Sequence, residues 1–322
     1  MRRFLLIVIL LVGMLNYSAP AQVPNSSNPA PPPRREVAIT IDDLPMGGDA
    51  SNLQVVQSAT KRMLAGLATH KAPAIGFVNE GKIHVKDEVD ERINILRMWL
   101  DAGATLGNHT FSHLRLYNTP LQQYQDDVIR GEVITRRLMQ ERGITQLYFR
   151  HPFMNTGSTK EIKDSFEAFL RARNYRVTPY TIEIADNVFN AAHAKAKQQN
   201  NKELVVRIRS AYLDFLDTKF DFFERRSKRN VGYEVKQIFL FQVNELNAEC
   251  LPDMLGRLKQ RGYSFITLDQ ALQDKAYQIP DEYVGQGGIS WLHRWTINRG
   301  LEMALMEEPE PPKFILDLVG EQ

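Results

Sequence analysis

Short runs of β-branched and aromatic residues alternate with longer amphipathic stretches along most of this 322-residue chain. We predict strands at 37–41, 74–78, 104–106, 147–149, 175–177 (continuing at 181–184), 238–243 and 264–267. Helical patterns lie near 53–70, 87–102, 120–142, 159–173, 190–229 and 247–261. Such alternation predicts an α/β fold with a mainly parallel sheet covered by helices. About seven strands in one continuous series favour a closed or nearly closed (β/α) barrel over two separate domains.

The beginning of the chain resembles a secretory signal peptide. A basic start at Arg2 and Arg3 is followed by an apolar run at 4–15 and by small residues ending at Ala21. An uncleaved membrane anchor is the alternative, but the run is shorter than the roughly 20 residues that a bilayer needs. We expect residues 1–21 to be removed and the protein to be exported, periplasmic or secreted, without a stable membrane span.

Composition separates the rest of the chain into three parts. Residues 22–35, rich in Pro, Asn and Ser, are predicted to form a flexible linker. A barrel domain is expected at 36–276, with a helical insertion at about 187–235 and a C-terminal extension at 277–322.

The near balance of 40 basic and 38 acidic residues argues against a nucleic-acid binder. A single cysteine, Cys250, excludes a disulfide framework and suits an exported protein that folds without one.

Two adjacent carboxylates, Asp42 and Asp43, end the first predicted strand. Side chains alternate along a strand, so the two carboxylates should point in different directions. One could then bind a metal ion while the other stays free as a base. A turn or helix cap before Pro45 is the alternative interpretation.

Two histidines, His109 and His113, follow the third strand. We expect them on one helical turn, where a spacing of four places both imidazoles on the same side. Together with Asp43 they make three protein ligands and leave room for water and substrate, as in catalytic zinc sites. The same set suits a non-haem iron oxygenase. The spare carboxylate of Asp42 favours hydrolysis, because an oxygenase needs no such base.

Arg150 ends the fourth strand and precedes His151 and Pro152. An arginine at this position could hydrogen-bond Asp42 and keep it ionised. The alternative is a surface arginine at the start of a loop.

These motifs, in this order, resemble the polysaccharide deacetylases, carbohydrate esterase family 4 with the NodB homology domain. The matching segments are Thr40-Ile41-Asp42-Asp43, His109-Thr110-Phe111-Ser112-His113 and Arg150-His151-Pro152-Phe153, within about residues 36–275. The resemblance implies a distorted (β/α) barrel and one divalent metal ion. Zn²⁺ is expected, with Co²⁺, Mn²⁺ or Ni²⁺ as alternatives.

The resemblance also assigns roles to individual residues. Asp43, His109 and His113 would bind the metal, Asp42 would be the general base, and Arg150 would position it. A backbone N–H near Phe153 would share the negative charge that develops on the substrate oxygen. The expected substrate-binding residues are Pro152, Phe153, Leu240 and Gln242.

Two further motifs depart from the family pattern. The fourth stands as Glu183-Ile184-Ala185-Asp186-Asn187, which keeps Asp186 but has Asn187 in place of the usual aromatic residue. The fifth stands as Leu240-Phe241-Gln242, with Gln242 where the family has a general-acid histidine that Asp186 would orient. An amide cannot donate that proton, because it does not titrate near neutral pH. His151 and His293 are candidate replacements, although packing between two tryptophans is the favoured role of His293.

We therefore expect an exported metal-dependent hydrolase that removes N- or O-acetyl groups from a glycan. Its partner would be the acetylated glycan substrate, with no nucleic acid involved. The alternative is a catalytically impaired homologue that binds metal and glycan, which the loss of the histidine at position 242 favours. An iron oxygenase is the third and least favoured function.

Overall fold

The computed structural model describes residues 34–297, 299–300 and 307–320. The predicted signal peptide at 1–21 and all but the last two residues of the predicted linker lie outside this part of the chain. Within the described residues, no helix has both the length and the apolar character that a membrane crossing requires.

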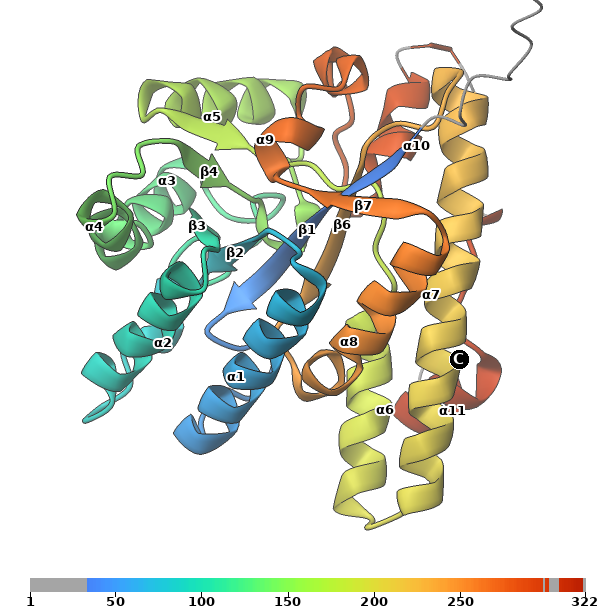
Figure 1. Cartoon of the computed structure of the whole chain (residues 1–322). Coiled ribbons are helices and arrows are strands. Elements are labelled where there is room, and N and C mark those ends of the chain that lie inside the picture. The colour runs from blue at the N-terminus through green and yellow to red at the C-terminus, as the bar shows by residue number, and fades with distance from the viewer. Residues whose placement is uncertain (1–33, 298, 301–306, 321–322) are drawn as a thin grey trace, which may run out of the picture. The chain divides into compact units, whose positions relative to one another are not determined.

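A single sheet of parallel strands forms the centre of the structure (Figure 1). Its strands are β1 (Arg35–Leu44), β2 (Ala74–Val78), β3 (Thr105–Asn108), β4 (Leu147–Phe149), β5 (Tyr175–Val177), β6 (Gln237–Gln242) and β7 (Tyr263–Ile266). They follow the order β5-β4-β3-β2-β1-β6, and β7 pairs with the first residues of β1. Ile182, after β5, forms a parallel bridge with Phe239 of β6. This bridge connects the two ends of the strand order, and the predicted distorted (β/α) barrel is confirmed.

Helices surround the sheet (Figure 1). They are α1 (Leu53–His70), α2 (Val89–Asp101), α3 (Leu121–Arg130), α4 (Val133–Glu141), α5 (Lys160–Ala172), α6 (Asp186–Gln198), α7 (Lys202–Val231), α8 (Glu245–Gln260), α9 (Leu268–Ala271), α10 (Trp291–Ile297) and α11 (Lys313–Val319). The described residues also form short 3₁₀ turns at η1 (Glu80–Ile83), η2 (Pro152–Met154) and η3 (Lys275–Gln278).

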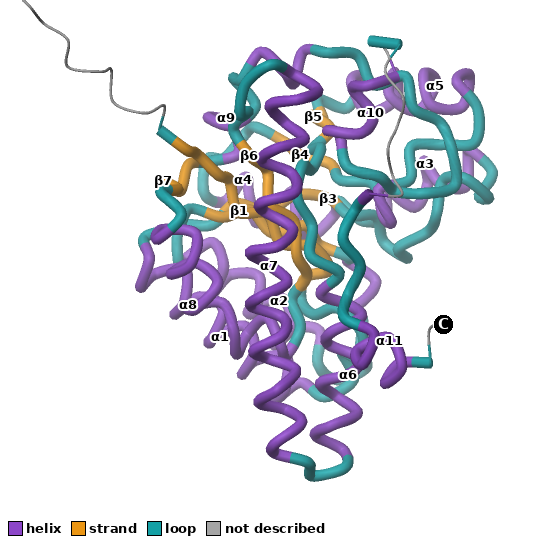
Figure 2. The backbone as a smooth tube through the Cα atoms, turned by 90° about the vertical axis from the view of Figure 1, so that its right-hand side faces the viewer, coloured by secondary structure: helices purple, strands orange, loops and turns teal. Residues whose placement is uncertain are grey.

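The helical pattern at 190–229 corresponds to two helices, α6 and α7, which form a long hairpin beside the barrel (Figure 2). Asn200 has a left-handed backbone, with φ of 53°, and ends the first helix. The side chain of Asn201 then accepts a hydrogen bond from the backbone N–H of Leu204 and caps the second helix. Phe220 of α7 packs edge-on against Phe239 of β6, so the hairpin covers the barrel wall at that strand.

The pattern at 120–142 is also divided, into α3 and α4, by a close approach of the backbone. A Cβ atom on Gly131 would lie 2.5 Å from the carbonyl carbon of Thr110 and 2.6 Å from the nitrogen of Phe111. Only glycine therefore fits where the α3–α4 junction meets the loop after β3. This contact supports the loop that carries both histidines.

The central strand β1 is buried from Val37 to Leu44. Its near-continuous apolar character is typical of parallel strands that are covered on both faces. Thr40 is an exception in the middle of this strand, and its hydroxyl donates a hydrogen bond to the carbonyl oxygen of Phe239 at 2.7 Å. The polar residues at the end of β1 are thus held on a rigid element.

We expect Gly107→Ala in β3 to lower the free energy of unfolding by about 1–3 kcal/mol, the usual cost of overpacking. A Cβ at this position would lie 2.5 Å from Cε1 of Phe77 and 3.1 Å from the backbone oxygen of Tyr148. Urea denaturation of the full chain measures the change.

Gly256→Ala in α8 is the matched control. Its nearest new contact would be 3.7 Å away, at Cε1 of His70. Because alanine loses less backbone entropy than glycine in a helix, this variant should gain about 0.5–1 kcal/mol. Equal destabilisation of the two variants would contradict the packing described here.

Candidate metal centre

The end of β1 does not continue as a regular strand. The pairing register with β2 shifts between Ile41 and Leu44, and Asp43 has a left-handed backbone with φ of 67°. The simple alternation predicted for Asp42 and Asp43 is therefore wrong in detail, because a bulge turns the chain between them. Both carboxylates approach imidazoles: Asp42 Oδ2 is 3.8 Å from His109 Nε2, and Asp43 Oδ1 is 3.5 Å from His113 Nε2.

The two histidines lie in a loop, so the predicted helical turn is wrong. Thr110 and His113 have left-handed backbones, with φ of 65° and 56°. Side chains hold this conformation: Asn108 Oδ1 accepts from the Thr110 N–H at 2.7 Å, and Thr110 Oγ1 accepts from the His113 N–H at 3.0 Å. The rings of His109 and His113 are nevertheless neighbours, with centroids 5.0 Å apart.

Asp43, His109 and His113 each offer a ligand atom, and these atoms lie within 4.8 Å of one another. The Nδ1 atom of His109 is 2.8 Å from the carbonyl oxygen of Arg150, which can only accept. Nδ1 therefore carries the proton, and Nε2 keeps its lone pair for a metal ion. Burial lowers the pKa of both histidines to about 4, so the imidazoles are neutral, as metal binding requires. The donor set fits a divalent ion.

Lys82, in η1 after β2, is a member of the site that the sequence motifs did not include. Its Nζ lies 3.2 Å from Asp43 Oδ1 and 3.1 Å from the carbonyl oxygen of Met46. Burial raises the pKa of Asp43, but the opposing charge of Lys82 helps to bring it below the usual value, and the carboxylate stays ionised. The available signal was its position just after a barrel strand, where such folds collect functional residues.

Asp42 forms a buried ion pair with Arg150, whose Nη1 is 2.9 Å from Asp42 Oδ1. Arg150 is fully buried, so it is not the surface arginine of the alternative interpretation. It also donates to Thr40 Oγ1 at 2.8 Å and to the carbonyl oxygen of Pro179 at 2.9 Å. Burial raises the pKa of Asp42 to about 6, although Arg150 acts in the opposite direction. Arg150 occupies only Oδ1, and Oδ2 faces the histidines.

Gln242 lies beside Asp42, because the two residues are register partners where β1 and β6 end. Asp186, at the start of α6, does not bind the Gln242 side chain. Its Oδ2 accepts hydrogen bonds from the backbone N–H of Gln242 and from the side-chain amides of Asn244 and Asn247, at 2.9, 2.9 and 2.5 Å. Burial raises the pKa of Asp186 to about 7. Asp186 therefore holds the end of β6 in place.

The remaining predicted residues lie at different depths. Phe153 is 45% exposed and its ring centroid is 4.5 Å from that of His113, whereas Pro152 is buried. Leu240 is half-buried and packs against the core. Phe189 does not replace the aromatic residue missing from the fourth motif, because it is buried against Tyr212 and Phe215.

Neither histidine suggested as a replacement proton donor is available. His151 is buried against Phe149 and Phe166, and burial holds its pKa well below the usual range. His293 is buried and forms a 2.9 Å hydrogen bond with Glu308, as its favoured structural role requires. Neither His151 nor His293 can therefore replace the proton donor that is missing at position 242.

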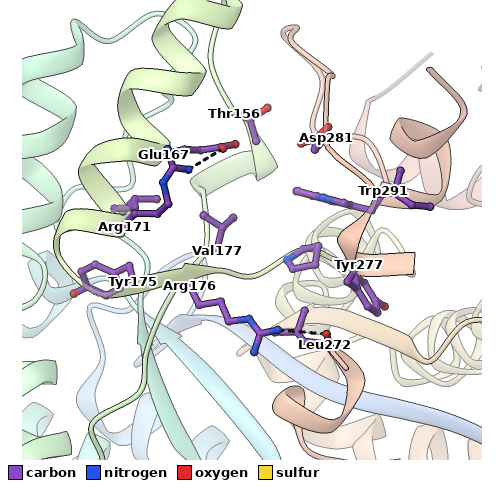
Figure 3. A pocket seen from close by; sticks show the side chains of 13 residues that line it. Thr156, Glu167, Arg171, Tyr175, Arg176, Val177, Leu272, Tyr277, Asp281 and Trp291 are labelled. Carbon is purple, nitrogen blue, oxygen red and sulfur yellow. Dashed lines mark hydrogen bonds and ion pairs between the residues drawn. The ribbon is translucent and has the colours of Figure 1, made fainter. Parts of the chain in front are cut away.

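A separate cavity of about 340 Å³ lies between the α5–β5 region and the chain that follows β7 (Figure 3). Trp291, Tyr277 and Pro179 contribute its apolar lining, and Arg171 and Arg176 its positive charge. The residues of the metal centre do not line it. We assign it no role in the chemistry of Asp42.

Comparison with known proteins agrees with the motifs. Residues 30–168, less than half of the chain, match the family model described as polysaccharide deacetylase. The match includes all three metal-ligand candidates together with Asp42 and Arg150, and it supports the family that the motifs resemble. It ends before Asp186 and Gln242, so the divergent motifs lie beyond it.

Individual relatives are distant. A peptidoglycan-N-acetylglucosamine deacetylase from Bacillus cereus is 24% identical over 153 residues, which cover 48% of this chain and 46% of the relative. The solved structure of a CE4 family pseudoenzyme from Bacillus anthracis is 16% identical, with a TM-score of 0.49, covering 75% of this chain and 66% of that one. Peptidoglycan deacetylase PdaC from Bacillus subtilis is 17% identical, with a TM-score of 0.46 and coverage of 77% and 95%. At these identities, function has to be inferred from this chain's own residues.

We expect His113→Ala to remove stoichiometric metal, because one of the three protein ligands is lost. Inductively coupled plasma mass spectrometry of the purified, zinc-equilibrated protein measures the amount of bound metal per chain. His70→Ala is the matched control, since His70 lies at the end of α1 and contacts Phe265 instead of the site. Full metal content in the His113 variant would contradict the ligand assignment.

Proposed function

We propose that this protein is an exported, metal-dependent hydrolase that removes N- or O-acetyl groups from a glycan. The observation that carries the proposal is the division of labour between two adjacent carboxylates. Asp43 lies with two neutral imidazoles, while Asp42 is held apart by Arg150. A site that only bound metal would have no evident need for a second carboxylate with its own buried cation.

The proposed base is Asp42, and its reacting atom is Oδ2. Because Arg150 binds Oδ1, the carboxylate is fixed in orientation and Oδ2 is left to accept a proton from water. Burial makes this carboxylate a stronger base than an exposed aspartate, since its pKa is about 6. A divalent ion at Asp43, His109 and His113 would polarise the acetyl carbonyl and lower the pKa of the attacking water.

Phe153 would stabilise the reaction from the other side of the site. Its backbone has a left-handed conformation, with φ of 54°, in the η2 turn directly after Arg150 and His151. A backbone N–H in this turn would donate to the oxygen on which negative charge develops. The exposed ring of Phe153 beside His113 would form part of the substrate wall.

The second candidate function is a catalytically impaired homologue that binds metal and glycan. Gln242 favours this second function. The amide is the register partner of Asp42, at the position where the family that the motifs resemble has its general acid. General-acid help is typically worth about 100- to 10,000-fold. Its loss would slow cleavage of an amide, whose amine must be protonated to leave. Cleavage of an ester with a good leaving group would suffer less.

Asp42→Asn should retain metal and lose hydrolysis. The amide is nearly isosteric with the carboxylate but cannot take a proton from water. The measurement is acetate release from N-acetylated and O-acetylated sugar oligomers, with metal content determined in parallel. A variant that keeps both metal and wild-type turnover would eliminate Asp42 as the base.

Gln242→His should raise the rate on an N-acetylated oligomer by up to about 100-fold and change cleavage of an aryl acetate much less. The contrast follows from leaving-group basicity, since an aryl oxide departs without a proton. The measurement is kcat/KM for both substrates at matched metal content, and Gln242→Asn is the control that changes the side chain without adding an acid. A wild type that cleaves the amide rapidly, and slows when histidine is introduced, would show that another group supplies the proton.

A further inference from the structure

Arg115 lies two residues after the ligand candidate His113, and none of the acidic residues that the structure describes is its ion-pair partner. Its guanidinium carbon lies 4.2 Å from the centroid of the Phe153 ring, and that ring in turn lies 4.5 Å from the His113 ring. Among the residues that the structure describes, no carboxylate forms an ion pair with Arg115 within 4.0 Å. Its side chain makes one long hydrogen bond, 3.4 Å, to the carbonyl oxygen of Gln286. A guanidinium has five N–H donors, and most of them therefore remain open.

The surroundings keep this guanidinium in a defined place. The cation–π contact with Phe153 and the hydrogen bond from Nη1 to the Gln286 carbonyl oxygen both restrain it. Gln286 belongs to the chain that follows the barrel, and this segment is itself attached beside the site. Asn155 donates a hydrogen bond to the carbonyl oxygen of Gly285 at 2.8 Å, and Tyr180 donates one to that of Gly288 at 2.7 Å.

The positive and negative charges at the metal centre balance without Arg115, so its own charge is additional. The two carboxylates, Asp42 and Asp43, are matched by two cations, Arg150 and Lys82. A bound divalent ion and Arg115 would therefore give the metal centre and its surroundings a net positive charge, which attracts anionic substrates.

We propose that Arg115 forms a carboxylate-binding subsite beside the metal centre, so that the preferred substrate is an acidic glycan with a carboxylate next to the acetylated sugar. This inference rests on the proposed function and specifies its substrate class. A planar guanidinium matches a carboxylate through two parallel hydrogen bonds. Two ring contacts separate it from the ligand His113, so the subsite would lie close to the reacting sugar without contacting the acetyl group.

The test uses matched pairs of substrates with the metal-loaded protein. One pair is an N-acetylated strand whose alternate sugars carry a lactyl carboxylate, and the same strand with these groups methyl-esterified. The second pair carries glucuronate on alternate sugars, free or esterified. Acetate release gives kcat/KM, and equilibrium binding to each strand is measured separately, both at low and at high salt.

We expect the wild type to prefer the free acid in at least one pair, and the pair that shows this preference identifies the source of the carboxylate. Arg115→Met should reduce the preference by about 10- to 100-fold, the value of a charge-assisted hydrogen-bonded pair. Arg115→Lys keeps the charge without the planar fork and should retain part of it. Arg137→Met on α4 also removes one positive charge, from an exposed pair with Glu141, and should leave the preference intact.

Two outcomes separate this inference from the proposed function. Equal rates and equal binding for acid and ester in both pairs would overturn the carboxylate subsite, while acetate release from either form would leave the hydrolase intact. Preferential binding of the acid that Arg115→Met abolishes, without acetate release from any strand, would support the subsite and contradict the hydrolase.

Discussion

The buried ion pair between Asp42 and Arg150 organises the rest of the site. Arg150 directly follows β4, Asp42 lies near the end of β1, and the same guanidinium donates to the Pro179 carbonyl in the chain that follows β5. It thereby connects three parts of the barrel wall at the level of the metal ligands. Removing one partner of such a pair typically costs about 3–5 kcal/mol, because an uncompensated charge remains buried. The backbone oxygen of Arg150 also lies 2.8 Å from His109 Nδ1 and fixes the tautomer of that histidine.

The sequence predicted the fold well, because β2 and β4 are short apolar runs and helix α1 has a clear period. Tertiary contacts decided what it missed. The histidine loop owes its left-handed residues to Asn108, Thr110 and the close approach of Gly131, and none of these contacts is visible in a spacing of four. The bulge at Asp43 likewise depends on pairing with β2. Lys82 was missed because no motif contains it. Its position just after β2 was the one available signal, since functional residues of barrels follow the strands.

The two halves of the barrel differ in how closely their motifs match the family that this chain resembles. The ends of β1, β3 and β4 carry the metal ligands, the proposed base and its arginine, all within the family match. The end of β6 carries Gln242. There Asp186 accepts hydrogen bonds from the backbone N–H of Gln242 and from two side-chain amides. In the proposed reaction, the site would therefore support activation of water better than protonation of the leaving group. This imbalance suits a substrate with a good leaving group, or one that is held firmly by contacts outside the reacting centre.

The proposed function requires the two adjacent carboxylates to have different partners, a metal ion for Asp43 and an arginine for Asp42. A crystal structure of the zinc-loaded protein, with the ion located by its anomalous scattering, would show both partners at once. We expect coordination by Asp43, by Nε2 of His109 and by His113, with Asp42 still bound to Arg150. An ion coordinated by Asp42, with Arg150 released from it, would show that the two carboxylates do not have these separate roles.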